Sequence, residues 1–122
     1  FGPSGCLWPS IYWHQWLISK WHSPGSSANN HLTGEMVGLF CASLAWPCYD
    51  ESARWRDLSL RILERESVRQ TYPSGLNREL AFDYHLYSLE LFAVTAVEAD
   101  RYGCRLSDEF HAAKASMYEA IE

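Results

Sequence analysis

The sequence lacks three patterns that would point directly to a class of function. The cysteines show no CxxC spacing and no paired-histidine pattern accompanies them, so we expect no metal site. No apolar run approaches the roughly 20 residues that cross a bilayer, so we expect no membrane partner. Basic residues are also few, because 10 Lys and Arg face 15 Asp and Glu for a net charge of −5. That balance argues against nucleic acid as a partner, since phosphate binding needs basic groups.

The amino terminus also lacks the pattern of an export signal, since no basic segment and apolar segment follow Phe1. We therefore expect an internal fragment or a processed product. The composition is that of a globular protein, with 48% hydrophobic and 15% aromatic residues over 122 positions, which suits one domain. The even number of cysteines permits disulfides without requiring them. We expect buried or half-buried free thiols at Cys6, Cys41, Cys48 and Cys104.

Apolar residues at three- and four-residue spacing predict five helices joined by short loops. The expected helices start at about Ser10, run from about His31 to Ala45, from Tyr49 to about Gln70 and from Asp83 to about Tyr102, and start after Ser107. Asp83 and Ser107 are predicted N-caps, and Gly103 suits the end of the fourth helix. Since no segment has a convincing strand pattern, the predicted fold class is all-α, built of antiparallel helical hairpins.

Three of these helices have unusual faces. The first carries four tryptophans and is apolar over most of its circumference, which predicts mainly buried aromatic rings and a neighbour absent from this chain. Aromatic platforms that stack on sugar rings are the alternative. In the second helix, Gly34, Gly38 and Ala42 recur every four residues and predict close approach of another helix or of a ligand. The third alternates Arg and Glu and predicts a solvated outer face from Arg54 to Arg69.

Polar residues gather where the second and fourth helices begin. Asn29, Asn30 and His31 open the second helix, and Tyr84 lies in the first turn of the fourth. Alternate helices of an up-down array start at the same end, so these groups can converge. An amide and a helix N-terminus can neutralise a carboxylate, a histidine can act as a base, and a tyrosine can protonate a leaving oxygen. These are the steps needed to eliminate across a uronic acid.

The same residues also admit structural roles. Asn30 could be only a helix cap, His31 could pair with Glu35 one turn later, and Tyr84 could belong to the core. Two other functions stay open: a non-catalytic helical carbohydrate-binding or scaffold module, and a glycoside hydrolase that uses two carboxylates, Glu35 and Glu79.

Two blocks of sequence carry a family resemblance. The first is SANNHLTGE over Ser27 to Glu35, followed by Gly38-Leu39-Phe40. The second joins GLNRE, which starts at Gly75, to FDYH, which ends at His85. Together, and over residues 10–121, they resemble the heparinase II/III and alginate lyase group of polysaccharide lyases. Leu80 departs from the family pattern, where a polar residue is usual.

The resemblance implies that residues 1–122 are one partial segment of an (α/α) toroid catalytic domain. The remaining toroid helices and a C-terminal β-sandwich domain would be partners supplied by the parent chain. The implied activity is that of a polysaccharide lyase, which cleaves an acidic, uronate-containing polysaccharide of the alginate or glycosaminoglycan type by β-elimination without a cofactor. The implied location is periplasmic or secreted in a bacterium.

The resemblance also implies roles for single residues. Asn30 would help to neutralise the substrate carboxylate, and His31 would be a base or charge stabiliser. Tyr84 would be the catalytic acid, or acid and base together. The residues implied beside the cleft, as supporting groups for substrate binding, are Glu35, Asn77, Glu79 and His85.

Overall fold

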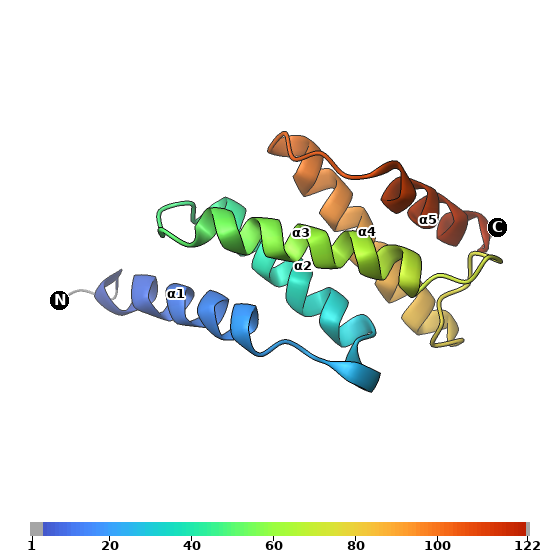
Figure 1. Ribbon diagram of the computed structural model, residues 1–122, viewed down its shortest axis with the longest axis horizontal. Helices are drawn as coiled ribbons and strands as arrows, with labels where there is room; N and C mark the ends of the chain where they lie inside the picture. Colours follow the sequence, from blue (N-terminus) through green and yellow to red (C-terminus); the bar gives the residue numbers. More distant parts are fainter. Residues whose placement is uncertain (1–3, 122) are drawn as a thin grey trace.

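The computed structural model describes residues 4–121, and every regular element in this range is a helix (Figure 1). Five α-helices and one short 3₁₀ turn follow each other as α1 (Ser4–Lys20), η1 (Gly25–Ser27), α2 (Asn30–Ala45), α3 (Ser52–Arg69), α4 (Phe82–Arg101) and α5 (Asp108–Glu119). Within the described residues, the only β-type pairing is an isolated bridge between Thr71 and Asn77. The prediction of an all-α fold of antiparallel helical hairpins is confirmed.

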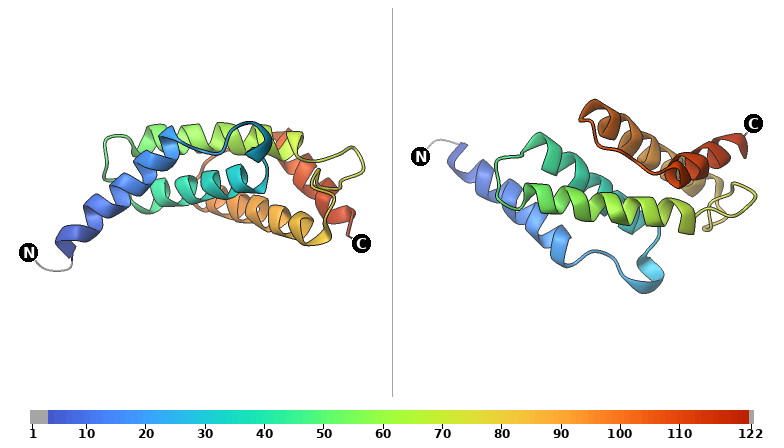
Figure 2. Two further views of the ribbon diagram at one scale, coloured as in Figure 1. Left: turned by 90° about the horizontal axis from the view of Figure 1, so that it is seen from below. Right: turned by 45° about the horizontal axis from the view of Figure 1, so that its top comes forward.

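The five helices alternate in direction, and α2 lies at the centre of the array. It packs against α1, α3 and α4, while α5 packs against α3 and α4. Figure 2 shows α2 between α3 and α4 in its left view. Both α2 and α4 begin at the end of the molecule where the carboxyl terminus lies (Figures 1 and 2). This arrangement brings the two polar helix starts to one end, as the alternation predicted.

The core lies between α2, α3 and α4, and α5 closes it against α3 and α4. Met36, Leu39 and Phe40 on α2 are fully buried, as their spacing predicted. Phe92 of α4 and Phe110 of α5 meet edge to face, with ring centroids 5.7 Å apart. This contact holds α5 on α4, while α4 itself packs directly on the central helix α2.

Helix α1 differs from the prediction in its start and in its exposed face. It begins at Ser4 rather than Ser10 and continues through Pro9, because a proline removes one backbone donor without forbidding a helix. Trp8, Trp13 and Trp21 are exposed, so the prediction that they are buried is wrong for the described chain. Helices α2 and α3 pack against α1, and Tyr49 in the turn between them donates to the Trp8 carbonyl oxygen at 2.7 Å. These neighbours leave the face with the exposed tryptophans uncovered in the described part of the chain.

Two helix starts also differ from the prediction. Asp83 is not the N-cap of α4: that position is Ala81, whose backbone is extended, and Asp83 lies in the first turn. There its carboxylate still faces the positive end of the helix dipole. Helix α3 begins at Ser52 rather than Tyr49, since residues 49–51 form a turn. The predicted cap of α5 is confirmed, because Ser107 Oγ accepts the Phe110 N–H at 3.3 Å.

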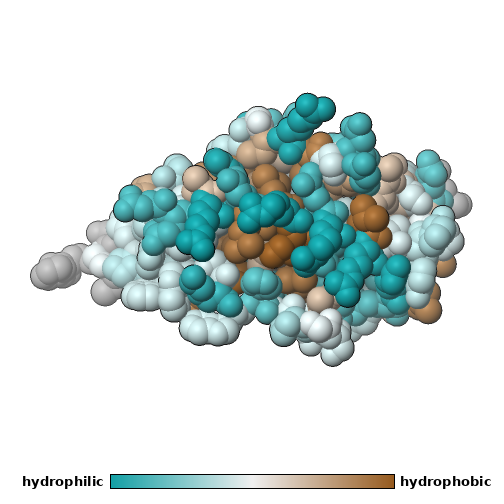
Figure 3. Space-filling view, viewed as in Figure 1, coloured by the Kyte–Doolittle hydropathy of each residue, from teal (hydrophilic) through white to brown (hydrophobic). Residues whose placement is uncertain are grey.

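The charged face of α3 is solvated except at one residue. Figure 3 shows charged side chains across the face of the molecule that α3 occupies, with apolar residues between them. Glu66 is the exception, since it is fully buried and accepts hydrogen bonds from Gln70 Nε2 at 3.1 Å and Arg65 Nε at 2.9 Å. Its assignment to the outer face was therefore wrong.

The described thiols are free at Cys41, Cys48 and Cys104. Cys41 and Cys104 are half-buried as predicted, whereas Cys48 lies exposed in the turn after α2. The expectation for the Cys6 side chain lies outside what the structure describes. Among residues 4–121, no helix combines the length and the apolar character needed to cross a bilayer.

Candidate functional site

The first turn of α2 is held by Asn29, which is the N-cap of the helix. Its Oδ1 accepts the His31 N–H at 3.1 Å. Asn30 is therefore not the cap, and its side chain is free for another role. Asn30 is buried, with 7% of its surface exposed, and its Oδ1 has no hydrogen-bond partner within the described residues. His31 is exposed beside it at the helix N-terminus.

The first turn of α4 presents Tyr84 at the surface. Its side chain is 49% exposed, so the alternative that it is a core residue is excluded. Tyr87, one turn further along, is also about half exposed. Both residues belong to the first two turns of α4 (Phe82–Arg101), and the start of α4 lies at the same end of the molecule as the start of α2 (Figure 1).

The packing of α2 on α4 determines where Asn30 and Tyr84 lie along the two helices relative to each other. A methyl group added at Gly34 would lie 3.5 Å from the Tyr87 hydroxyl and 4.0 Å from Leu91 Cδ1, so α4 approaches α2 closely at this glycine. Asn30 precedes Gly34 by one turn, and Tyr84 precedes Tyr87 by one turn. Since both helices start at the same end, the first turns that carry Asn30 and Tyr84 lie side by side.

Gly34 faces α4, as a neighbouring helix was predicted to lie there, but an added methyl group would make only ordinary van der Waals contacts, so the packing does not require glycine. Gly38 has no atom of the described residues within 4 Å of an added methyl group, so no neighbouring helix approaches it. The alternative, close approach of a ligand, stays a prediction.

The loop before α4 is tied to the start of α2 by one side-chain hydrogen bond. Asn29 Nδ2 donates to Glu79 Oε1 at 3.0 Å, and the Glu79 N–H donates to Asn77 Oδ1 at 2.9 Å. The other carboxylate oxygen of Glu79 is buried without a partner in the described part of the chain. The predicted convergence of the two polar blocks therefore rests on a direct contact.

The residues predicted to support substrate binding each have an internal partner. The carboxylate of Glu35 accepts the Ser23 N–H at 2.7 Å and the Ser23 hydroxyl at 2.8 Å. His85 is buried and accepts the Asn77 N–H at Nδ1, 3.1 Å away, while its Nε2 faces the Met117 carbonyl oxygen at 2.9 Å. The ring is therefore the tautomer that carries its proton on Nε2.

Sequence reasoning missed two polar residues behind this site. Gln70 Nε2 donates to the Asn29 carbonyl oxygen at 3.1 Å and to Glu66 Oε2 at 3.1 Å, so the end of α3 also holds the start of α2. The spacing of Glu66 and Gln70, four residues apart on one helix, was a detectable signal of a pair. Nothing in the local sequence shows that the pair faces inward.

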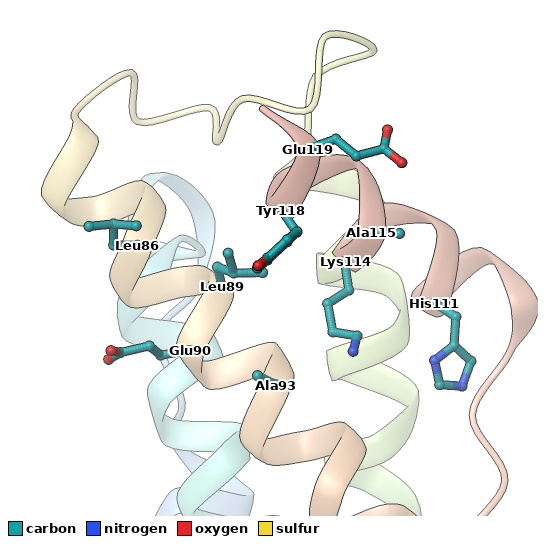
Figure 4. Close-up of a pocket in the computed structure, with 9 residues that line it drawn as sticks. All are labelled: Leu86, Leu89, Glu90, Ala93, His111, Lys114, Ala115, Tyr118 and Glu119. Carbon is teal, nitrogen blue, oxygen red and sulfur yellow. The ribbon is translucent and has the colours of Figure 1, made fainter. Parts of the chain in front are cut away.

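A groove of about 660 Å³ lies elsewhere, between α4 and α5 (Figure 4). Leu86, Leu89 and Ala93 of α4 face the aliphatic and aromatic parts of Lys114 and Tyr118 across it. None of the predicted site residues lines this groove. A smaller cavity of about 230 Å³ lies beside the 76–82 loop and includes Asn77 and His85 in its wall.

Comparisons with known proteins agree with this fold. The family model described as heparinase II/III N-terminus matches residues 10–121. A heparin-sulfate lyase from Bacteroides stercoris is 35% identical over 80 residues, which are 66% of this chain and 12% of that protein. A heparin-sulfate lyase from Pedobacter heparinus is 30% identical over 63 residues, 52% of this chain and 10% of that protein.

A solved structure of a heparinase III superposes on the model with a TM-score of 0.70 and 28% identity, covering 84% of this chain and 16% of that structure. The chain thus spans between a tenth and a sixth of the length of these relatives. The helical array matches part of the toroid region of that structure, as the resemblance implied. Because the family model covers almost the whole chain, the chain belongs to the heparinase II/III family, in the region that the model describes as the N-terminus.

Proposed function

We propose that this chain supplies part of the catalytic domain of a polysaccharide lyase, which cleaves a uronate-containing polysaccharide by β-elimination. The observation that carries the proposal is the meeting of two first turns, with Asn30 and His31 on α2 and Tyr84 on α4 at one end of the array. Membership of the heparinase II/III family supports the same reaction. The other toroid helices and a β-sandwich domain would come from the parent chain.

The reaction needs three groups, and the two first turns offer them. Asn30 donates a hydrogen bond to the uronate carboxylate, where the N-terminal end of α2 adds a positive potential. This lowers the cost of removing the proton from the adjacent carbon. His31 or the deprotonated Tyr84 takes that proton, a C=C bond forms, and the C–O bond to the leaving sugar breaks. Tyr84 returns a proton to the leaving oxygen.

The distribution of charge supports an acidic substrate. Residues 1–34 contain no Asp or Glu, although the whole chain has a net charge of −5. That segment contains α1 and the first turn of α2, so its surface adds no carboxylates that would repel a polyanion. Both matched curated relatives are heparin-sulfate lyases, which favours a glycosaminoglycan as substrate, with alginate as the alternative.

The internal partners of the two glutamates argue against hydrolysis by a carboxylate pair. Ser23 occupies both oxygens of Glu35, and Asn29 occupies Oε1 of Glu79. A glycoside hydrolase needs two carboxylates free to reach the scissile bond. Neither glutamate meets that requirement in this arrangement.

The test is to incubate the parent protein with heparan sulfate and with alginate and to follow the ultraviolet absorbance of the unsaturated uronate. We expect product from at least one polymer, and Tyr84→Phe and Asn30→Ala should each lower kcat by about 100-fold or more, as loss of a general acid or of charge stabilisation does. Absence of unsaturated product on every uronate polymer, or full activity of Tyr84→Phe, would refute the proposal. Sugar binding without turnover would instead indicate the non-catalytic module.

A further inference from the structure

We propose that Asn29 and Glu79 are positioning residues, and that their hydrogen bond aligns Asn30 and His31 on α2 with Tyr84 on α4. The inference deepens the proposed function and rests on it. It also gives Glu79 a different role from the substrate contact that the resemblance implied.

On the α2 side, Asn29 is bound through both polar atoms of its side chain and through its carbonyl oxygen. Its Oδ1 caps the helix through the His31 N–H, and its Nδ2 donates to Glu79. Its carbonyl oxygen accepts from the Thr33 N–H at 3.0 Å, from Thr33 Oγ1 at 3.1 Å and from Gln70 Nε2 at 3.1 Å. Because Asn29 is held at several atoms, a displacement of Glu79 would also displace Asn29 and the residue that follows it, Asn30.

On the α4 side, Glu79 belongs to a loop that is fixed to two helices. Its N–H donates to Asn77 Oδ1, and the Asn77 N–H donates to His85 Nδ1. His85 is in turn held by the Met117 carbonyl oxygen of α5, and it follows Tyr84 directly in the chain. The hydrogen bond from Asn29 to Glu79 therefore completes a chain of hydrogen bonds that links Asn29, next to Asn30, with His85, next to Tyr84.

The charge of Glu79 favours positioning over substrate contact. One carboxylate oxygen is taken by Asn29, and the other is buried. A carboxylate placed against a uronate would repel it, and the hydrogen bond from Asn29 instead holds Oε1 of Glu79 against the protein. The two side chains that Glu79 contacts in this chain of hydrogen bonds, Asn29 and Asn77, are both neutral amides. Neither is a cation that would attract the carboxylate away from Asn29.

The experiment separates the cap from the positioning bond in the parent lyase. Asn29→Ser keeps a helix-capping oxygen but is too short to reach Glu79, and Asn29→Asp keeps the cap but turns the donor into an acceptor that faces a carboxylate. We expect each to lower kcat by about 10- to 100-fold with KM changed less than about threefold, because a small misplacement of reacting groups costs that much. The double variant Asn29→Asp, Glu79→Gln exchanges donor and acceptor and should recover kcat to within about fivefold of the original.

The control is Glu98→Gln, which removes a carboxylate near the opposite end of α4 and should leave kcat and KM unchanged. A kcat unaffected by Asn29→Ser, or a double variant no more active than Asn29→Asp, overturns the inference while the proposed function stands. If the unmodified parent forms no unsaturated product, the proposed function fails instead. In that case NMR of this chain decides the geometry: Asn29→Asp should shift the His31 and Tyr84 ring signals, the double variant should restore them, and unshifted signals overturn the inference.

Discussion

At the scale of single residues, Gly75 is the position where the backbone leaves no room for a side chain. Its φ is +84°, a region that favours glycine, and a methyl group there would collide with the carbonyl of Ser116 on α5. The loop that carries Asn77 and Glu79 is thus seated directly on α5. Any added carbon must push the two apart.

We predict that Gly75→Ala lowers the free energy of unfolding by about 2–4 kcal/mol, since positive-φ strain and a backbone clash add. Urea unfolding followed by circular dichroism measures it. Gly103→Ala is the matched control, because Gly103 has a φ of +66° but open space around it. It should cost only about 1 kcal/mol from strain. Equal losses in the two variants would contradict the close seating of the loop on α5.

The thiol of Cys41 provides a second prediction at this scale. Burial, and then the negative charge of Glu98, raise the pKa of Cys41 above its ordinary value. The folded state therefore keeps the proton to higher pH than the unfolded chain. The stability that this provides is present below about pH 8.5, the pKa of an unfolded thiol, and is lost as the pH rises through the raised pKa of the folded state.

We predict that iodoacetamide alkylates Cys41 in the native chain at least about 10-fold more slowly at pH 8 than Cys48, which is exposed. Peptide mass spectrometry after timed quenching measures both rates. Above pH 9 the alkylation rate of Cys41 should approach that of Cys48, and in 6 M urea the two rates should be equal. Similar rates at pH 8 in the native chain would contradict the burial of Cys41.

At the scale of the elements, the N-cap of α5 tests whether a cap predicted from the sequence stabilises its helix. Ser107 Oγ accepts the Phe110 N–H, and Phe110 is fully buried against Phe92. We predict that Ser107→Ala costs about 1 kcal/mol of unfolding free energy and that Ser107→Asp costs less than half of that. Ser26→Ala, in an exposed turn, is the control and should be neutral. Thermal unfolding of the three variants decides it.

The elements also show what sequence reasoning could and could not reach. Apolar spacing placed α2, α3 and α5 within a few residues, because Met36, Leu63 and Phe110 face one core. The start of α4 was also placed within a few residues, but its N-cap is Ala81 and not Asp83, because distant contacts such as that of the Arg78 N–H with the Gln70 carbonyl oxygen fix the loop before it. A residue with a high propensity for N-caps, such as Asp83, therefore need not occupy the N-cap position when contacts with other elements fix the start of the helix.

The candidate site follows the same division. The alternation of helix directions was enough to bring Asn30 and Tyr84 to one end. The bond from Asn29 to Glu79 joins residues 50 positions apart, and no periodicity encodes such a pair. The burial of Glu66 escaped notice for the same reason, since its partner Gln70 acts only once α3 lies on α2. Local patterns specify elements, and contacts between elements specify which polar groups face inward.

At the scale of the whole molecule, the described chain exposes apolar side chains on one helix in an amount unusual for a monomer. Helix α1 exposes Leu7, Trp8, Trp13 and Leu17, and Trp21, which follows its last residue, is also exposed. The chain matches 16% of a heparinase III structure. A contiguous apolar surface of this kind favours association in water.

We predict that the isolated 122-residue chain associates reversibly, with an apparent mass in sedimentation velocity that rises with concentration over about 10–300 μM. The double variant Trp13→Gln, Trp21→Gln should reduce that association and leave the unfolding midpoint nearly unchanged, because both rings are exposed. Trp55→Ala is the contrasting variant: Trp55 is 3% exposed, and its loss should cost about 3–5 kcal/mol without reducing association of the folded fraction. A chain that stays monomeric at every concentration, or a double variant that associates as strongly, would show that the α1 face does not drive association. The two variants together separate a tryptophan that stabilises the fold, Trp55, from tryptophans that are exposed at the surface and drive association, Trp13 and Trp21.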